Sequence, residues 1–229
     1  MLIAVSSAGS TQTEWVVMAE RTRAVFLDAL GTLVELEPPW EHADAFADGV
    51  PRERLISALR AEMAYYREHS HEGRDAQSLA DLRERCAAIV SRELDRPVSA
   101  EALMQAIRFR GFPDAAPALE RLRARGLSLA CVSNWDCSLP DVLARCGLGG
   151  ALDAVIASAT AGSRKPEPGI FAAALEATGC SPEQALHVGD TRGEDLDGAR
   201  AARIRALLLD RAGNGDIASL DEIDDHLAS

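Results

Sequence analysis

Four separated segments of the chain carry side chains that could act on an anion with the help of a metal ion. These residues are Asp28 in FLDALGTLVE, Ser133 and Asn134 in VSNWD, Lys165 in SRKPEPGIF, and Asp190 and Asp195 in HVGDTRGEDLDGAR. A carboxylate can serve as a nucleophile, and carboxylate oxygens are ligands that Mg²⁺ prefers. A hydroxyl and an ammonium group can hold phosphate oxygens. This set of residue types suits phosphoryl transfer, because cations must offset the repulsion between an attacking carboxylate and a phosphate.

Lys165 is the only lysine of the chain, and the other 23 of the 24 basic residues are arginine. A chain that uses arginine wherever a surface cation suffices has kept one compact ammonium group, which carries its charge at a point rather than in a planar fork. The alternative is a solvated lysine near the start of a helix. The uniqueness of Lys165 favours a functional role.

The segments that would position these residues alternate short apolar runs with amphipathic helices from residue 24 onward, which is typical of a parallel sheet with crossover helices. The five expected strands are Ala24 to Asp28, Leu127 to Ser133, Leu152 to Ser158, Ala185 to Asp190 and Arg205 to Asp210. Three of them end in Asp28, Ser133 or Asp190. The carboxyl ends of parallel strands share one edge of the sheet, so we expect these side chains to converge there. The predicted fold class is α/β with a five-stranded parallel core.

The segment between the first strand and Gly111 carries only helical periodicity. Its two apolar stripes are Leu55, Leu59, Met63 and Tyr66, and Leu79, Leu82, Cys86 and Ile89. We therefore predict a helical insert at residues 37–111 within a core formed by 21–36 and 112–229. Residues 1–20 lack the basic and long apolar regions of a secretory signal and are interpreted as an N-terminal tail.

The composition excludes several classes of protein. Five cysteines with no metal-ligand spacing argue against a disulfide scaffold or a zinc module and favour a reducing compartment, interpreted as the cytoplasm. A net charge of −12 argues against nucleic acid or an anionic membrane as a partner, since both require a basic face. No apolar stretch approaches the roughly 20 residues of a transmembrane helix. The expected partner is a small molecule held by a local site, and the chain is expected to be a monomer or a homodimer.

Taken together, the four segments resemble the haloacid dehalogenase (HAD) superfamily of hydrolases from about residue 24 to the C-terminus. The resemblance implies a Rossmann-like core with a mobile helical cap, and a Mg²⁺-dependent phosphatase that forms an aspartyl-phosphate on Asp28. It also implies that Ser133, Asn134 and Lys165 hold the phosphoryl group. The implied metal ligands are Asp28, Asp190, Asp195 and the backbone carbonyl of residue 30.

One position departs from the family pattern. Most phosphatases of the family have a second Asp two residues after the nucleophile, which acts as general acid and then base, whereas this chain has Leu30. Leucine keeps the backbone carbonyl but cannot transfer a proton. Because a positioned acid or base typically contributes about 10²- to 10⁴-fold, we expect slow hydrolysis of ordinary phosphomonoesters.

Two alternatives remain open beside a phosphatase of a small phosphorylated metabolite. Haloacid dehalogenases have a similar first motif, D-A-Y-G-T against D-A-L-G-T here, and they need neither metal nor leaving-group acid. They carry an Arg soon after the nucleophile, whereas the first Arg after Asp28 is Arg52. Asp190 and Asp195 would also repel a halocarboxylate anion in a metal-free site. The second alternative is a catalytically weak protein that binds ligands in the phosphate pocket.

Further residues are weaker candidates for the site. Trp135 and Asp136 follow the second expected strand and should lie near the pocket, while His187 is interpreted as a core residue. Aromatic and histidine side chains of the insert could contact the substrate, although packing or solvation explains such side chains more often. These insert residues are Trp40, His42, Phe46, Tyr65, Tyr66, His69 and His71.

Overall fold

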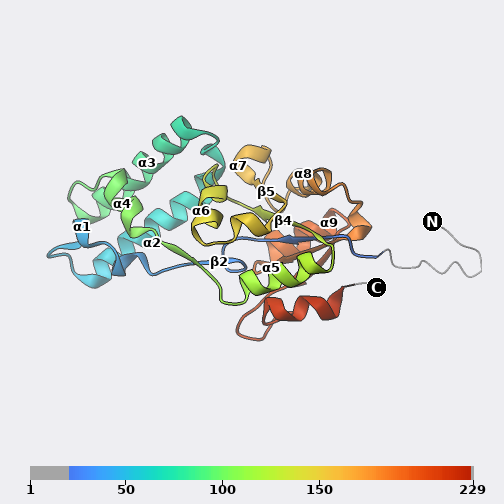
Figure 1. Ribbon diagram of the computed structural model, residues 1–229. Coiled ribbons are helices and arrows are strands. Elements are labelled where there is room, and N and C mark those ends of the chain that lie inside the picture. Colours follow the sequence, from blue (N-terminus) through green and yellow to red (C-terminus); the bar gives the residue numbers. More distant parts are fainter. Residues whose placement is uncertain (1–20, 228–229) are drawn as a thin grey trace, which may run out of the picture.

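The computed structural model describes residues 21–227, so the tail expected at 1–20 lies outside the described residues. A five-stranded sheet in the order β5-β4-β1-β6-β7 forms the centre of the fold (Figure 1). Its strands are β1 (Ala24–Leu27), β4 (Ser128–Ser133), β5 (Ala154–Ala157), β6 (Ala185–Gly189) and β7 (Arg205–Leu208). All neighbouring pairs in this sheet are parallel. The predicted α/β fold with a five-stranded parallel core is confirmed, and each strand lies within its expected segment.

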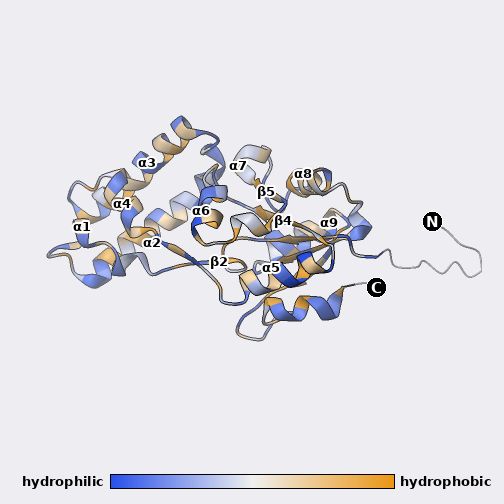
Figure 2. Ribbon diagram, viewed as in Figure 1, coloured by the Kyte–Doolittle hydropathy of each residue, from blue (hydrophilic) through white to orange (hydrophobic). Residues whose placement is uncertain are grey.

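Helices cover both faces of this sheet because its strands are apolar on both sides. Val25 and Leu27 of β1 belong to one buried cluster, whereas Ala24 and Phe26 belong to another. The first cluster contains α5 (Ala115–Ala124) and α6 (Leu139–Arg145), and the second contains α8 (Pro168–Thr178) and α9 (Gly198–Ala201). Figure 1 shows α8 and α9 on the opposite side of the sheet from α5, and Figure 2 shows the apolar strands between them. Packing on both faces therefore holds the strands in place, and with them the residues at their carboxyl ends.

A helical region follows β1 and has its own core. Its elements are η1 (Pro39–Glu41), α1 (Asp44–Ala47), α2 (Arg52–His69), η2 (Ser70–Glu72), α3 (Ala76–Leu94) and α4 (Ala100–Ala106). Leu55 and Leu59 of α2 pack with Leu82 and Cys86 of α3 in a buried cluster, as the predicted stripes require. The region lies to one side of the sheet (Figure 1), and the helical insert expected from the sequence is present.

Two short strands that were not predicted from the sequence connect this helical region to the core. β2 (Val34–Leu36) pairs antiparallel with β3 (Phe109–Gly111), with Glu35 opposite Arg110. These strands occupy the two points where the chain enters and leaves the helical region. Three-residue strands produce little periodicity, so their pairing could not be recognised from local sequence.

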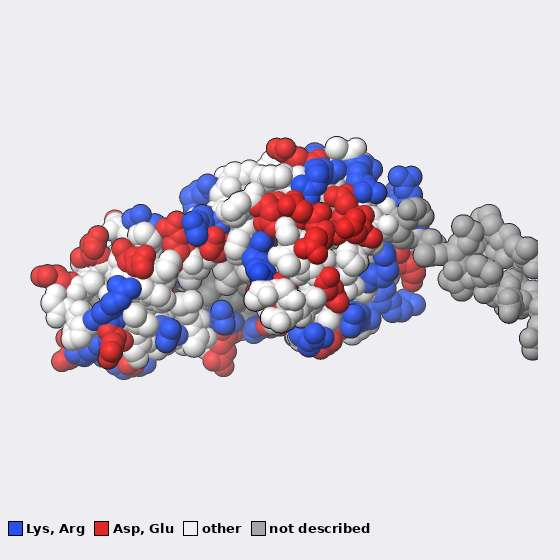
Figure 3. All heavy atoms as spheres, turned by 90° about the horizontal axis from the view of Figure 1, so that it is seen from below, with Lys and Arg blue, Asp and Glu red and all other residues white. Residues whose placement is uncertain are grey.

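The remaining elements connect the strands. They are η3 (Gly149–Ala151), α7 (Ser158–Ala161), η4 (Pro182–Gln184), η5 (Arg192–Asp197), which is a π-helix, and η6 (Leu220–His226). Between α8 and β6 the chain forms only the short turn η4, which begins after Ser181. None of the helices in the described part of the chain is long and apolar enough to cross a membrane. Acidic side chains form a dense group on the face shown in Figure 3, in keeping with the net charge of −12.

Candidate active site

The polar residues at the strand ends lie side by side because the sheet places their strands next to one another. Asp28 follows β1, which lies between β4, ending at Ser133, and β6, which precedes Asp190. The backbone N–H of Asp28 donates to the carbonyl of Val188 at 2.9 Å and extends the register of β1 with β6 by one residue. The Oγ atom of Ser133 donates to Oδ1 of Asp28 at 3.0 Å. The expected convergence at the carboxyl edge of the sheet is observed.

Lys165 reaches this edge from the loop before α8. Its side chain is 1 % exposed, and Nζ lies 2.5 Å from Oδ1 of Asp28 and 2.5 Å from Oδ1 of Asp195. Burial acts to lower the pKa of Lys165, but the two carboxylates outweigh burial and raise that pKa above its usual value. Lys165 is therefore a buried cation between two carboxylates, which is incompatible with a solvated surface lysine.

Asn134 holds the backbone of Lys165 in place. Its Oδ1 atom accepts from the N–H of Lys165 at 2.8 Å, and its Nδ2 atom donates to the carbonyl of Lys165 at 3.0 Å. The same Nδ2 atom donates to Oε2 of Glu194 at 3.0 Å. The side-chain amide of Asn134 therefore fixes the loop that carries Lys165, a role that was not predicted from the sequence. The contact of Asn134 with phosphate stays a prediction.

Asp28, Asp190 and Asp195 form the acidic cluster of the site, and one ligand atom from each lies within 4.8 Å of the others. Asp195 is fixed by the backbone N–H of Thr191, at 3.0 Å, and by Nε2 of His187, at 2.9 Å. Burial acts to raise the pKa of Asp195, but Lys165 and His187 lower it by more, so that this pKa lies well below its usual range. An ionised Asp195 is therefore available beside the other two carboxyl groups.

The other two carboxyl groups are less well compensated. Desolvation raises the pKa of Asp28 to about 7, with Lys165 opposing and Asp195 reinforcing that shift. Desolvation also raises the pKa of Asp190, against the hydrogen bond from Thr191. The three carboxyl groups share one lysine and lack a second neighbouring ammonium or guanidinium among the described ion pairs. Such oxygen-rich, under-compensated clusters fit a hard divalent cation, so these residues could hold a metal ion.

Two glycines make the close approach of these carboxylates possible. A Cβ atom on Gly31 would lie 2.0 Å from Oδ2 of Asp190, and one on Gly189 would lie 2.1 Å from Cγ of Asp195. Gly31 also has a φ of +86°, in the left-handed region that glycine adopts readily. Any side chain at either position would displace a member of the acidic cluster.

The turn after Asp28 is held from the C-terminal part of the chain by Arg211. The Nη2 atom of Arg211 donates to the carbonyl of Thr32 at 2.8 Å, and its two Nη atoms bind the carboxylate of Asp114 at 3.0 and 3.1 Å. Its guanidinium carbon lies 3.6 Å from the centroid of the Phe112 ring. Arg211 therefore ties the turn to the start of α5. Sequence reasoning missed this residue, because its partners lie far away in the chain.

Leu30 lies in this turn, and its half-buried side chain contacts the apolar core cluster and lines the cavity above Asp28. No carboxyl group stands at this position. The structure thus places an apolar surface where the resemblance would have a proton donor.

A cavity of about 610 Å³ extends from Asp28 into the helical region. Leu30, Met63, Phe109 and Trp135 are among its apolar lining residues, and the Phe109 and Trp135 rings lie 5.0 Å apart. Such a volume and lining are typical of a small-molecule site. Trp135 and Asp136 line the cavity as expected.

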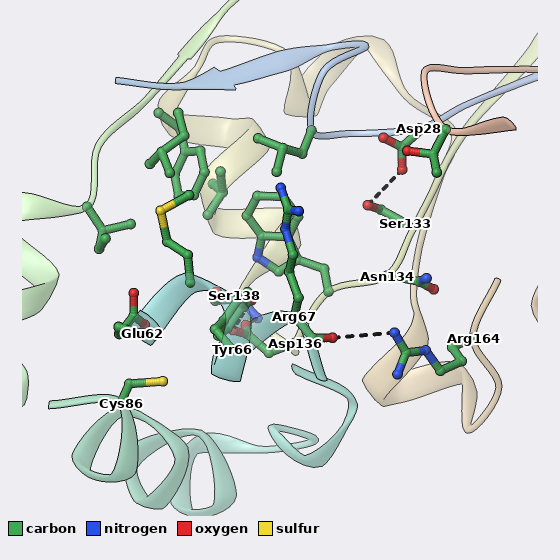
Figure 4. A pocket seen from close by; sticks show the side chains of 18 of the residues that line it. Asp28, Glu62, Tyr66, Arg67, Cys86, Ser133, Asn134, Asp136, Ser138 and Arg164 are labelled. Atoms are coloured by element: carbon green, nitrogen blue, oxygen red, sulfur yellow. Dashed lines mark hydrogen bonds between the residues drawn. The ribbon is translucent and has the colours of Figure 1, made fainter. Parts of the chain in front are cut away.

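The helical region contributes polar residues to this cavity, of which Arg67 and Glu62 were not predicted from the sequence. Arg67 of α2 points into the cavity, and Arg164 donates to the backbone carbonyl of Arg67 at 3.4 Å (Figure 4). Tyr66 donates to Oδ2 of Asp136 at 2.7 Å and thereby connects α2 to the core. Glu62 lines the end of the cavity away from Asp28. The apolar stripe with Met63 and Tyr66 could have pointed to Glu62 and Arg67, because these residues are their direct neighbours on the same helix.

Most of the other aromatic and histidine candidates are not brought to the cavity. Tyr66 lines it, whereas six of the residues named in the sequence analysis are absent from its described lining: Trp40, His42, Phe46, Tyr65, His69 and His71. Phe46 packs in the core of the helical region, and Tyr65 stacks on His69 with ring centroids 4.0 Å apart. His187 is fully buried as expected, and it also supports Asp195.

A family model described as haloacid dehalogenase-like hydrolase matches residues 22–203, which is most of the chain. The chain belongs to this family of hydrolases. The resemblance inferred from the four polar segments is therefore confirmed.

Curated relatives match part of the chain. A "haloacid dehalogenase-like hydrolase domain-containing protein 3" from Bos taurus is 35 % identical over 59 % of this chain and 49 % of its own length. A phosphoserine phosphatase from Thermus thermophilus is 39 % identical over 45 % of this chain and 42 % of its own length. The chain therefore spans less than half of either relative. The structure of an L-2-haloacid dehalogenase from Xanthobacter autotrophicus is similar with a TM-score of 0.64 and 27 % identity, covering 84 % of this chain and 79 % of that one.

Proposed function

We propose that the chain is a Mg²⁺-dependent phosphatase of a small phosphorylated metabolite, acting through an aspartyl-phosphate on Asp28. The observation that supports it most is the convergence of Asp28, Asp190 and Asp195 around Lys165. A metal-free site for an anionic substrate would not place three carboxylates together, because they would repel that substrate. The similarity to a phosphoserine phosphatase supports the same reaction class.

In this proposal Asp28 attacks phosphorus, the bond from phosphorus to the ester oxygen breaks, and water then hydrolyses the aspartyl-phosphate. Ser133 and Lys165 already contact Oδ1 of Asp28 and would hold the phosphoryl oxygens beside it, together with Asn134. Lys165 also limits the charge repulsion between Asp28 and the phosphate. Fixed donors and cations of this kind stabilise charge that develops on the transferred group.

The proposed metal ligands are Asp28, Asp190, Asp195 and the backbone carbonyl of Leu30. Mg²⁺ bound there would supply positive charge that draws the phosphate toward Asp28. Thr191 and His187 keep Asp195 oriented for this role through hydrogen bonds at 3.0 and 2.9 Å. Ligand orientation of this kind commonly determines metal affinity.

Leu30 would restrict the range of substrates. Phosphoryl transfer from an alkyl ester needs a proton on the departing oxygen, and Leu30 cannot provide it. The proposed enzyme therefore prefers esters whose leaving groups are stable as anions, such as aryl or acyl phosphates.

The helical region would act as a cap over the site, with the domain division at 37–111 that the sequence predicts. Contacts between Tyr66 and Asp136, and between Arg164 and the carbonyl of Arg67, bring this region onto the core. The small-molecule partner, the cytoplasmic location and the monomeric or homodimeric state stay predictions.

The decisive experiment compares hydrolysis of p-nitrophenyl phosphate by the parent and by Asp28→Asn, each with and without Mg²⁺. We expect turnover only by the parent and only with Mg²⁺. Turnover by Asp28→Asn equal to that of the parent would place the reaction elsewhere.

A dehalogenase-like hydrolase acting on a carbon centre is the second candidate, favoured by Leu30 and by the similarity to the Xanthobacter enzyme. Arg52, the first Arg after Asp28, pairs with Glu41 at 3.7 Å and is not among the described lining residues. Chloride release from 2-chloropropionate without Mg²⁺ would support this candidate over the phosphatase.

A further inference from the structure

The helical region buries one carboxyl group at the far end of the cavity. Glu62 lies on α2, is 4 % exposed and lines the cavity together with Cys86 of α3. Figure 4 shows Glu62 and Cys86 at the opposite end of the view from Asp28 and Ser133. Glu62 therefore faces the space that a leaving group would fill, and it takes no part in the proposed chemistry.

Glu62 lacks the partners that buried carboxylates usually have. Among residues 21–227 no ion pair includes it, and its one contact of hydrogen-bonding type is with the weakly donating thiol of Cys86. By contrast, the more exposed Glu72 binds Arg85 at 2.6 Å. Burying a carboxyl group without a good donor is costly, whereas an apolar residue of similar size would pack there without that cost. Burial also raises the pKa of Glu62, as expected for a carboxyl group without a cation.

The surface of the cavity that contains Asp28 and Glu62 is more apolar than polar. Leu30, Met63, Phe109 and Trp135 contribute apolar side chains, Met104 of α4 adds a flexible one, and Arg67 is a charged residue of the same lining. A group that crosses this surface gains most when its middle is apolar and its polar atoms are at its ends. One end would meet the phosphate site, and the other would meet Glu62.

We propose that Glu62 is a specificity-determining residue that accepts a hydrogen bond from a hydroxyl or amino group at the far end of the substrate's leaving group. The substrate class is then a phosphate ester with an apolar middle and a terminal hydrogen-bond donor. This inference rests on the proposed function, because it places the phosphate at Asp28. It adds a requirement at the other end of the molecule that the phosphate site does not impose.

Phosphonates test the inference without turnover, because their carbon to phosphorus bond is not cleaved by this reaction. Calorimetry would measure binding of n-alkylphosphonates, ω-hydroxyalkylphosphonates and ω-aminoalkylphosphonates with four, six and eight carbons, in the presence of Mg²⁺. For at least one of these chain lengths, we expect the hydroxyl or the amino compound to bind at least about tenfold more tightly than the alkyl compound of the same length. Comparing the hydroxyl with the amino series shows which of the two donors Glu62 prefers.

Matched variants locate the effect. Glu62→Met fills the same space without an acceptor and is expected to abolish the preference, whereas Glu53→Met, at an exposed position on the same helix, is expected to preserve it. Glu62→Gln keeps the shape of the side chain and loses its charge. It should weaken binding of the amino series, and it serves as a second test if Glu62→Met does not fold.

The outcomes separate this inference from the proposed function. If phosphonates bind but show no preference at any chain length, or if Glu62→Met keeps the preference, then Glu62 has no such role and the phosphatase proposal stands. If no phosphonate binds the parent, then the phosphate site itself is wrong, and the inference about Glu62 fails with it.

Discussion

The ammonium group of Lys165 lies 2.5 Å from the carboxylate of Asp195, and both side chains are 1 % exposed. The same ammonium group lies 2.5 Å from Asp28, so one buried cation joins the nucleophile proposed here to the acidic cluster. Removing one member of a buried ionic group leaves the others unpaired, and this generally costs several times more than losing a surface pair. Lys165 therefore links the stability of the site to its chemistry.

Lys165→Arg keeps the positive charge but replaces a point charge with a planar fork that does not fit between two carboxylates. We expect turnover of p-nitrophenyl phosphate to fall at least about tenfold, which corresponds to about 1.4 kcal/mol of transition-state stabilisation. Steady-state kinetics of the parent and the variant measure the change, with circular dichroism to establish that the variant is folded. Parental activity in the variant would contradict the proposed role of Lys165.

Metal binding should stabilise the native state. Mg²⁺ that binds Asp28, Asp190 and Asp195 only in the folded protein raises the free energy of unfolding by about 2.7 kcal/mol at a hundredfold excess over its Kd. The melting temperature of the parent should therefore rise with millimolar Mg²⁺, and that of Asp190→Asn should not. If the melting temperature of the parent does not change with Mg²⁺, this result would favour the metal-free dehalogenase alternative.

The pH dependence of stability should report on Glu62. Burial raises the pKa of Glu62 above the value of about 4.3 that it has in the unfolded chain. At pH values between the unfolded and the folded pKa, the folded protein therefore keeps a proton that the unfolded chain has released. The contribution of Glu62 is complete below that unfolded pKa and is lost as the pH rises through the folded pKa. Urea unfolding at several pH values should show Glu62→Gln gaining on the parent across this interval, while Glu53→Gln follows the parent. A constant difference between Glu62→Gln and the parent would contradict the raised pKa.

Arg211 should contribute more to stability than an exposed arginine does. It binds the carbonyl of Thr32 and the carboxylate of Asp114, whose side chain is 13 % exposed. Arg211→Met would leave these acceptors without their charged donor, so we expect the free energy of unfolding to fall by about 1.5 to 3 kcal/mol. The control is Arg125→Met, which removes a pair with Asp224 at an arginine that is 51 % exposed, and which should cost less than about 1 kcal/mol. Equal losses would argue against a special role for Arg211.

The parallel sheet could be predicted because each of its strands is a near-continuous apolar run, and its functional edge because three of the expected segments end at Asp28, Ser133 and Asp190. The contact between β2 and β3 could not, since Leu36 pairs with Phe109 across most of the helical region and neither three-residue strand has a local signal. Long-range pairing of this kind depends on the completed tertiary structure.

The part of the site at the edge of the sheet could be predicted from the sequence, whereas the part contributed by the helical region could not. Asp28 and Lys165 stand in motifs whose residue types are informative by themselves. Arg67 and Glu62 lie on α2, where helical periodicity separates a buried from an exposed face but does not say which turn of the helix overlies the core. Their position depends on how α2 and α3 pack together and on the contact of Tyr66 with Asp136.

Leu30→Asp tests the proposed mechanism as a whole. The parent should favour p-nitrophenyl phosphate over an alkyl phosphate, since only the first has a leaving group that departs with little protonation. Leu30→Asp places a carboxyl group beside Asp28 and should raise alkyl phosphate hydrolysis by up to about 10²- to 10⁴-fold. The side chain of Leu30 packs against the apolar core cluster, so desolvation and imperfect placement of the new carboxyl group would reduce this gain. The ratio of kcat/KM for the two esters measures the shift, and Leu30→Asn, which has similar size but cannot transfer a proton in the same way, is the control. If Leu30→Asp folds yet gains nothing on any phosphate ester while the parent releases halide from 2-chloropropionate, the dehalogenase-like reaction replaces the phosphatase.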